Sequence, residues 1–113
     1  MTWAKLDDSF PEHPKVVELS DRAFRIHVTA LCYCARNLTD GHVPAPTVRA
    51  FTLGKKAPIT ELVKAGVWNE NGRGAYIIHD YLDYNPSREH VEAERARKQE
   101  AGREGARKRW HNP

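Results

Sequence analysis

The sequence predicts a small α+β domain that is mostly helical, and three observations predict it. Apolar residues recur with the period of an α-helix over residues 21–38. Two shorter helical patterns follow, at 46–53 and 59–67, and a glycine with two lysines separates them. Two strand-like segments then flank an Asn-Gly pair, a strong signal for a tight turn. Two helices joined by a basic turn and followed by a β-hairpin are typical of a winged helix-turn-helix, which we expect over residues 38–84.

The longest predicted helix forms the spine of the expected core. Ser20 and Asp21 supply its N-cap, and Asp40-Gly41 ends it as a turn. The positions expected to face inward fit helical spacing: Phe24, Val28, Leu31, Ala35 and Leu38.

Shorter segments surround this helix. Residues 3–6 are expected to be an extended segment that docks on the core. Pro14 is suited to the first turn of a short helix over residues 13–19. Residues 42–44 are expected to be extended, because a residue that precedes proline disfavours the helical conformation.

The helix pair follows. The first helix is expected from Pro46 to Leu53 and stops at Gly54. Its inward positions are Val48, Phe51 and Leu53. The second helix has Pro58 near its start and ends at Gly66. Its shared apolar face is formed by Ile59, Leu62 and Val63.

The predicted hairpin has strands at 67–69 and 75–78, joined by residues 70–74. Beyond Asp80, the sequence YLDYN is expected to stay extended or to form a turn. A break at Asn85-Pro86 closes the predicted winged helix-turn-helix domain, residues 1–86.

Residues 87–113 are predicted to form a basic, polar C-terminal helix and tail. Ser87 caps the helix, which runs to about Ala101, and Gly102 and Gly105 interrupt the remainder. This helix is polar nearly all round, so we expect it to project into solvent or to fold on a partner.

The net charge of +3 lies entirely in that C-terminal segment. Residues 1–87 hold ten Lys/Arg and ten Asp/Glu, whereas residues 88–113 hold eight Lys/Arg and five Glu. A pI near 9.0 that arises from such a tail is consistent with a nucleic-acid partner. No apolar run approaches the ~18 residues of a membrane span, and the N-terminus has no signal-peptide pattern. The expectation is a soluble, cytoplasmic protein with no membrane partner.

The sequence offers no pattern for catalysis, for a metal or for a cofactor. Its six histidines are scattered, without HxH, HExxH or His/Cys ligand spacing. Leu53-Gly54-Lys55-Lys56 lacks the first glycine and the Ser/Thr of a phosphate-binding loop. Cys32 and Cys34 are two residues apart on a helix, which excludes a disulfide between them. We expect two reduced thiols, with at least one in the core, and no enzyme activity.

Candidate DNA contacts fall on the helix pair and the hairpin. The second helix of such a pair enters the major groove, so its expected outer face is Thr60, Glu61 and Lys64. Arg49 joins these candidates, and the turn adds Lys55 and Lys56, where phosphates would pass. The hairpin tip adds Asn71 and Arg73, beside glycines that permit a close approach to phosphate. The alternative is an ordinary solvated face and a flexible hairpin turn.

The tail is the third candidate contact. Its cations release counterions on binding phosphates, and Trp110 beside them is suited to stacking on a base. The candidates are Arg103, Arg107, Lys108 and Arg109. The alternative is a disordered basic terminus, or a linker to a further domain of a longer protein.

Several motifs together resemble a known family. They are WAKLDDSF at 3–10, HPK at 13–15, LTDG at 38–41, LVKAGVW at 62–68 and HDYLDY at 79–84. Over about residues 1–100 the chain resembles the N-terminal winged-helix region of small replication or DNA-binding proteins from actinobacterial phages and prophages, which are replisome-organiser-like. The resemblance implies a winged helix that binds DNA through its second helix and wing, with a protein partner in replication. Replisome organisers usually carry a further C-terminal domain, which this sequence lacks.

Two functions are therefore expected from the sequence. The first is a phage-type winged-helix protein that binds double-stranded DNA in replication initiation or transcriptional regulation. The second is an adapter whose winged helix and C-terminal helix bind a replication or transcription protein. A homodimer fits the first function, because one small module reads few base pairs.

Overall fold

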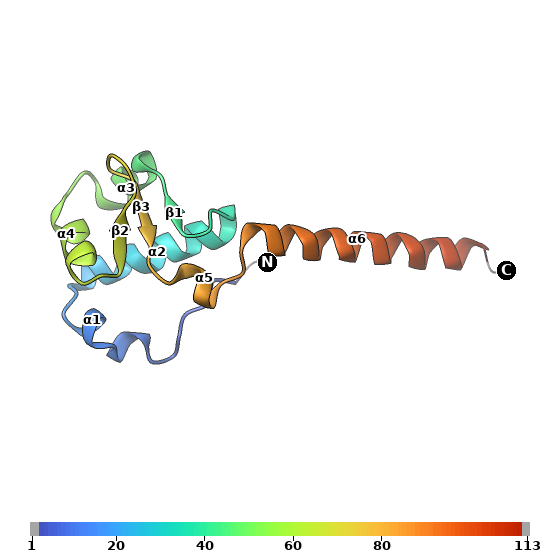
Figure 1. The fold of residues 1–113 in the computed structure, drawn as a ribbon, viewed down its shortest axis with the longest axis horizontal. Coiled ribbons are helices and arrows are strands. Elements are labelled where there is room, and N and C mark those ends of the chain that lie inside the picture. The colour runs from blue at the N-terminus through green and yellow to red at the C-terminus, as the bar shows by residue number, and fades with distance from the viewer. Residues whose placement is uncertain (1–2, 112–113) are drawn as a thin grey trace.

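The computed structural model describes residues 3–111 and is a mostly helical α+β structure with one small antiparallel sheet (Figure 1). A 3-10 turn at Phe10–Glu12 precedes the first helix. The helices are α1 Pro14–Val17, α2 Asp21–Asn37, α3 Ala45–Thr52, α4 Ala57–Lys64, α5 Tyr81–Tyr84 and α6 Arg88–His111. The strands are β1 His42–Val43, β2 Trp68–Glu70 and β3 Tyr76–Ile78.

Helix α2 is the spine of the core, as predicted, but its buried face differs from the expected one. The Ser20 hydroxyl accepts a hydrogen bond from the Ala23 amide at 3.2 Å, so the predicted N-cap is confirmed. The buried residues are Ala23, Ile26, His27, Ala30, Leu31, Cys34 and Ala35. Phe24, Val28 and Leu38 are only partly buried, so the predicted face was wrong at these three positions. Four of these seven side chains are small, and the fully buried Trp68 donates a hydrogen bond to one of the others, His27.

The sheet has the strand order β1-β3-β2, with both pairs antiparallel. The predicted hairpin is confirmed as β2 and β3, with Trp68 opposite Ile78. The extended piece predicted at residues 42–44 is a third strand, and His42 pairs with Ile77. Its pairing could not be read from the sequence, because two residues carry no alternating pattern. The largest fully buried side chains are Trp68, Leu62, Val43 and Cys34.

The helix pair forms with two corrections to its apolar face. Leu53 was expected to point inward, but its side chain is 76% exposed. It is the C-cap of α3 in the left-handed conformation, with φ of 54°, which turns the side chain away from the core. The preceding residue, Thr52, is buried in its place, and its hydroxyl donates to the Val48 carbonyl at 2.9 Å. Val63 was also expected to be buried, but it is 39% exposed on α4.

The N-terminal segment contacts the rest of the chain through the backbone of Lys5 rather than through the side chain of Trp3. The Lys5 amide donates to the Asn85 side-chain oxygen at 2.8 Å, and the Asn85 side-chain nitrogen donates to the Lys5 carbonyl at 3.3 Å. Trp3 remains 76% exposed. Phe10 provides the apolar contact instead, since its ring stacks on buried His27 with 5.1 Å between centroids.

The C-terminal part differs most from expectation. Residues 81–84 were expected to be extended or a turn, and they form the helical turn α5. Helix α6 was expected to end near Ala101, but it continues through Gly102 and Gly105 over 24 residues. Each glycine costs a helix about 1 kcal/mol relative to alanine, which weakens a helix without breaking it. Figure 1 shows α6 extending away from the other elements.

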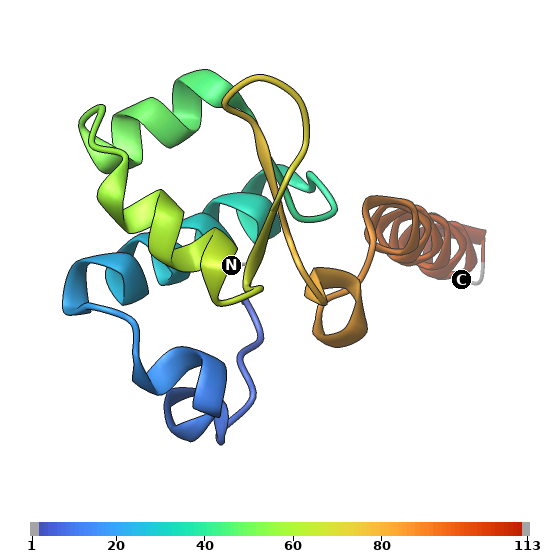
Figure 2. The same cartoon turned by 60° about the vertical axis from the view of Figure 1, so that its left-hand side comes forward.

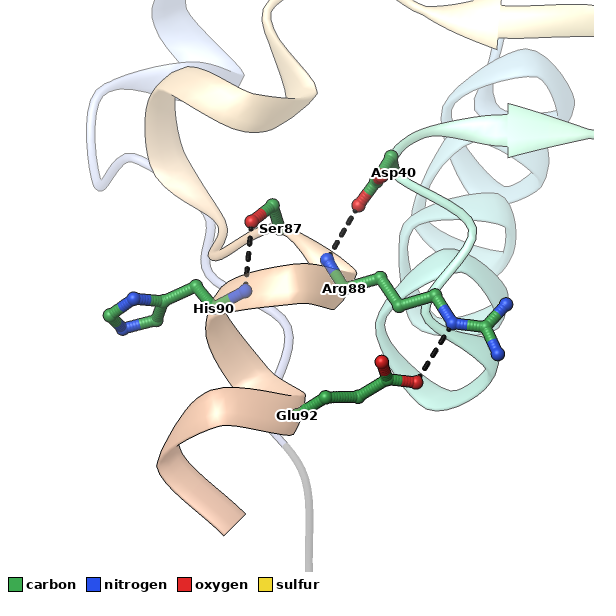
Figure 3. A network of polar contacts seen from close by, with 5 residues as sticks. All are labelled: Asp40, Ser87, Arg88, His90 and Glu92. Atoms are coloured by element: carbon green, nitrogen blue, oxygen red, sulfur yellow. Dashed lines mark hydrogen bonds and ion pairs between the residues drawn. The ribbon is translucent and has the colours of Figure 1, made fainter. Parts of the chain in front are cut away.

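Two side chains cap the start of α6, and one of them, Asp40, joins it to another part of the chain (Figure 3). The Ser87 hydroxyl accepts from the His90 amide at 3.1 Å, which confirms the predicted cap. The Asp40 carboxylate accepts from the Arg88 amide at 2.7 Å, and Asp40 lies between α2 and β1. The described chain measures 66 × 30 × 18 Å along its principal axes. Within residues 3–111, no helix has the length and apolar character that a membrane crossing requires.

Candidate nucleic-acid interface

Helix α4 presents one polar side to solvent. Its inward side is anchored by Pro58, Ile59 and Leu62, and Leu62 is completely buried. Thr60 and Lys64 lie on the exposed side, as predicted. The sequence prediction missed that Val63 also lies on this side. Its apolar side chain is suited to contact with a thymine methyl group.

Glu61 is the one predicted contact on α4 whose side chain is engaged by another element of the molecule. One carboxylate oxygen accepts from the Ser20 amide at 2.8 Å, and the other accepts from the Ser20 hydroxyl at 2.7 Å. These two hydrogen bonds lower the pKa of Glu61, because they stabilise its ionised form. Both oxygens are turned toward the start of α2.

The same contact fixes the position of α4. Ser20 caps α2 and is itself held by Glu61, so a short network joins α4 to the N-terminus of α2. The two residues are 41 positions apart in the chain. For that reason, sequence reasoning assigned Glu61 to the outer face and did not find this role.

The turn between α3 and α4 is basic and exposed. Lys55 and Lys56 are both exposed, and so is Arg49 on α3. The Lys56 carbonyl accepts from the Thr60 amide at 3.0 Å and from the Thr60 hydroxyl at 3.1 Å. The Thr60 hydroxyl hydrogen is therefore used inside α4, and its oxygen remains an acceptor. Three predicted cations thus lie on α3 and the adjoining turn.

The hairpin loop holds Arg73 in an exposed position between Gly72 and Gly74. Both glycines have positive φ angles, 91° and 72°, which permit the tight loop. The Asn71 amide donates to the Ala75 carbonyl at 2.9 Å and closes the loop. The Asn71 side-chain nitrogen lies 2.9 Å from His42 Nδ1 on β1, so this predicted contact is also engaged within the molecule. A Cβ added at Gly74 would lie 3.5 Å from Ala45 Cβ, which places the loop beside the first turn of α3.

The predicted tail contacts lie on α6, apart from the helix pair (Figure 2). Arg103 and Arg107 each have a guanidinium nitrogen 3.8 Å from a Glu100 oxygen. Lys108 and Arg109 are exposed, and neither has an ion pair within the described residues. The side chain of Trp110, the predicted stacking residue, lies outside the described residues.

A cavity of about 150 Å³ lies between the N-terminal segment and the core, lined by His27, Val67, Tyr81 and Asn85 among others. The Trp68 indole nitrogen donates to His27 Nδ1 at 2.9 Å. Burial lowers the pKa of His27 to about 4, so the ring is neutral at pH 7.

The two cysteines and the acidic side chains form no further site among residues 3–111. Cys34 is buried and Cys32 is exposed, and both are free thiols, as expected. In the described part of the chain, no three His, Cys, Asp or Glu side chains are grouped as a metal site.

Comparisons of this chain with protein-family models, with curated proteins and with solved structures found no match. What the chain does must therefore be inferred from its own residues and their contacts.

Proposed function

We propose that this chain is a winged-helix protein that binds double-stranded DNA, with α4 in the major groove. The element order supports this proposal, since α2, β1, α3 and α4 precede a two-stranded hairpin that completes an antiparallel sheet with β1. In this arrangement α3 and α4 form the helix-turn-helix and residues 71–75 form the wing. The phage-type replication or transcription role expected from the sequence stays part of the proposal.

The observation that carries the proposal is the composition of the exposed side of α4 and its turn. The only carboxylate on α4 is bound to Ser20, so Thr60, Val63 and Lys64 face solvent without an acidic neighbour of their own helix. Lys55, Lys56 and Arg49 add positive charge where phosphates would run. A surface with cations, one hydroxyl and one apolar group has the chemistry of groove and backbone contacts.

The proposed interface comprises Arg49, Lys55, Lys56, Thr60, Lys64 and Arg73, with Val63 as an apolar contact. Glu61 and Asn71 are left out because both side chains are engaged within the molecule. Arg103 and Arg107 are left out because both lie near Glu100. With few cations on α4 itself, backbone contacts dominate the binding and sequence preference is modest.

The test is fluorescence anisotropy with a duplex DNA over a salt series. The double variant Lys56→Glu/Lys64→Glu is expected to lower affinity at least tenfold, and to reduce the salt slope by about 2, because about one counterion is released per phosphate contact. The matched control is Lys5→Glu/Arg25→Glu, which changes the charge equally at exposed positions outside α3, α4 and the hairpin. No binding at low salt, or equal losses in both variants, contradicts the proposal.

A second candidate function is a protein-interaction adapter, and exposed apolar side chains favour it. Leu82 is 53% exposed and Tyr84 is 52% exposed on α5, where the N-terminal segment docks through Asn85. An adapter would retain its partner after nuclease treatment and lose it on Leu82→Ser/Tyr84→Ser substitution. DNA binding would then be insensitive to Lys56 and Lys64.

A further inference from the structure

Helix α6 has little contact with the rest of the described chain. At about 1.5 Å per residue, its 24 residues extend about 36 Å, close to one turn of B-DNA. Among the described residues, its polar contact to another part of the chain is the cap from Asp40 to the Arg88 amide. Figure 1 shows the remainder of α6 clear of the other elements. Packing against the rest of the described chain therefore does not explain which residues lie along α6.

The charges of α6 are unevenly distributed around the helix axis. Residues seven apart lie on one row, because seven residues make nearly two helical turns. From Val91 onward, two adjacent rows are Val91, Lys98, Gly105 and Arg95, Gly102, Arg109. None of the glutamates of α6 lies in either row: they are Glu89, Glu92, Glu94, Glu100 and Glu104. We name these two rows, six residues in all, the basic stripe.

The cations of the basic stripe differ from the other arginines of α6 in their ion pairs. Arg88 begins the row of Arg95 one repeat earlier and pairs with Glu92. Outside the stripe, Arg97 pairs with Glu94, and both Arg103 and Arg107 lie near Glu100, whereas Lys108 has no ion pair among the described residues. On the stripe, Arg95, Lys98 and Arg109 have no ion pair among the described residues. Glu92 and Glu94 border the stripe, but their ion pairs are with Arg88 and Arg97, so the stripe presents three cations without an ion pair among the described residues.

Both glycines of α6 lie on the basic stripe. A Cβ added at Gly102 or Gly105 would meet no atom within 4 Å, and neither residue has a positive φ angle. Neither packing nor backbone conformation within the described chain requires glycine there, although glycine weakens an exposed helix. A bare stretch between cations allows a partner's backbone to approach the helix axis closely.

We propose that the basic stripe of α6 is a second DNA contact, which lies along the phosphate backbone of the duplex that α4 binds. This inference rests on the proposed function. Charge complementarity selects the partner, since the stripe offers three cations without an ion pair among the described residues, and Val91 is its one large apolar residue. Arg95, Lys98 and Arg109 bind phosphates, and Gly102 and Gly105 let the strand lie close to the helix.

The test compares two triple variants of the full chain that remove the same charge from the same helix. Arg95→Gln/Lys98→Gln/Arg109→Gln alters the stripe, and Arg97→Gln/Arg103→Gln/Arg107→Gln alters the ion-paired arginines. By anisotropy with a duplex of about 25 base pairs, the stripe variant is expected to lower affinity at least tenfold at ~0.1 M salt. Its salt slope should fall by about 3, whereas that of the control should change by less than about 1.

The glycines are tested by a second matched pair. Gly102→Leu places a large side chain on the stripe, whereas Ala101→Leu places the same side chain on a different face of α6. Leucine strengthens the helix at Gly102, so a purely structural role predicts no loss of binding. We expect Gly102→Leu to weaken binding about fivefold or more and Ala101→Leu to leave it within about twofold.

Equal losses in the two triple variants, or no loss in either, would overturn the inference. If Lys56→Glu/Lys64→Glu abolishes binding while the stripe variant has no effect, the proposed function stands and the inference fails. If only the stripe variant loses binding, the role of α4 fails and the stripe remains a DNA contact. Binding of polyglutamate to the stripe more tightly than duplex DNA, at equal salt, would assign an acidic protein partner and overturn the inference.

Discussion

At the scale of single residues, a buried polar pair holds the centre of the domain. Trp68 is fully buried, and its indole N–H requires an acceptor, which His27 Nδ1 supplies. Because Nδ1 accepts, the proton of the neutral ring is on Nε2. Protonation of Nδ1 would break this hydrogen bond and place a charge beside the rings of Phe10 and Trp68.

This pair makes the stability of the fold depend on pH. The pKa of His27 is about 4 in the folded state and about 6.5 when unfolded, so the unfolded chain binds the extra proton between these values. Stability is fully present above about pH 6.5 and decreases by up to ~3 kcal/mol as the pH falls to about 4. Urea unfolding at pH 7 and at pH 4.5 measures this loss. His27→Gln retains an acceptor without titrating, and an equally large loss in that variant would contradict the assignment.

Two leucines on the helix pair test the burial pattern directly. Leu62 is completely buried, and Leu62→Ala is expected to lower the free energy of unfolding by roughly 2–5 kcal/mol. Leu53 is 76% exposed, so Leu53→Ala should change it by less than about 0.5 kcal/mol. Thermal or denaturant unfolding of the two variants gives the comparison, and similar losses would show that Leu53 is buried.

At the scale of elements, the sequence was sufficient where structure depends on local signals. The Ser20 and Ser87 caps and the hairpin around Asn71-Gly72 were predicted from a few neighbouring residues each. What failed depends on distant partners. His27 on α2 is hydrogen-bonded to Trp68, and the role of Glu61 follows from Ser20; each partner is 41 positions away in the chain, so no local pattern reveals it.

For the candidate site, too, the sequence was sufficient where exposure depends on local signals. Exposed cations on the turn and the hairpin follow from composition and turn signals, so the exposure of Lys55, Lys56 and Arg73 was predicted. Val63 was missed because an apolar residue at helical spacing is ordinarily assigned to the core. The basic stripe of α6 was missed because Gly102 and Gly105 predict breaks in a helix, and a predicted break hides any periodicity across it.

Because α6 is continuous, Gly102 and Gly105 lie inside a helix. Gly102→Ala/Gly105→Ala is expected to stabilise the C-terminal half of the helix by about 1 kcal/mol per substitution, because alanine is the better helix former. Amide hydrogen exchange should slow over residues 98–109, and the far-ultraviolet circular dichroism should gain helical signal. Unchanged exchange in this segment would mean that the helix ends near Ala101.

At the scale of the whole molecule, the chain consists of a small α+β part, residues 3–85, and the long helix α6 that follows it. The residues that precede α6 have a core that includes Trp68, and α6 extends from them with its first turn capped by Asp40 (Figure 3). Because the cap ties the first turn of α6 to the segment between α2 and β1, the proposed binding of both parts to one duplex is limited to a restricted set of orientations. Residues 1–87 are neutral overall and hold the proposed groove contacts, whereas residues 88–113 carry the net positive charge.

The most direct test of the central claim is an NMR titration of the ¹⁵N-labelled chain with a short duplex DNA. Amide shifts are expected to change first on the turn and α4, at Lys55–Lys64, and at Arg73 on the hairpin. Smaller changes should follow along α6 near Arg95 and Arg109. Changes confined to the N-terminal segment and α5, or no change at low salt, would contradict the claim that α4 and its basic turn bind DNA.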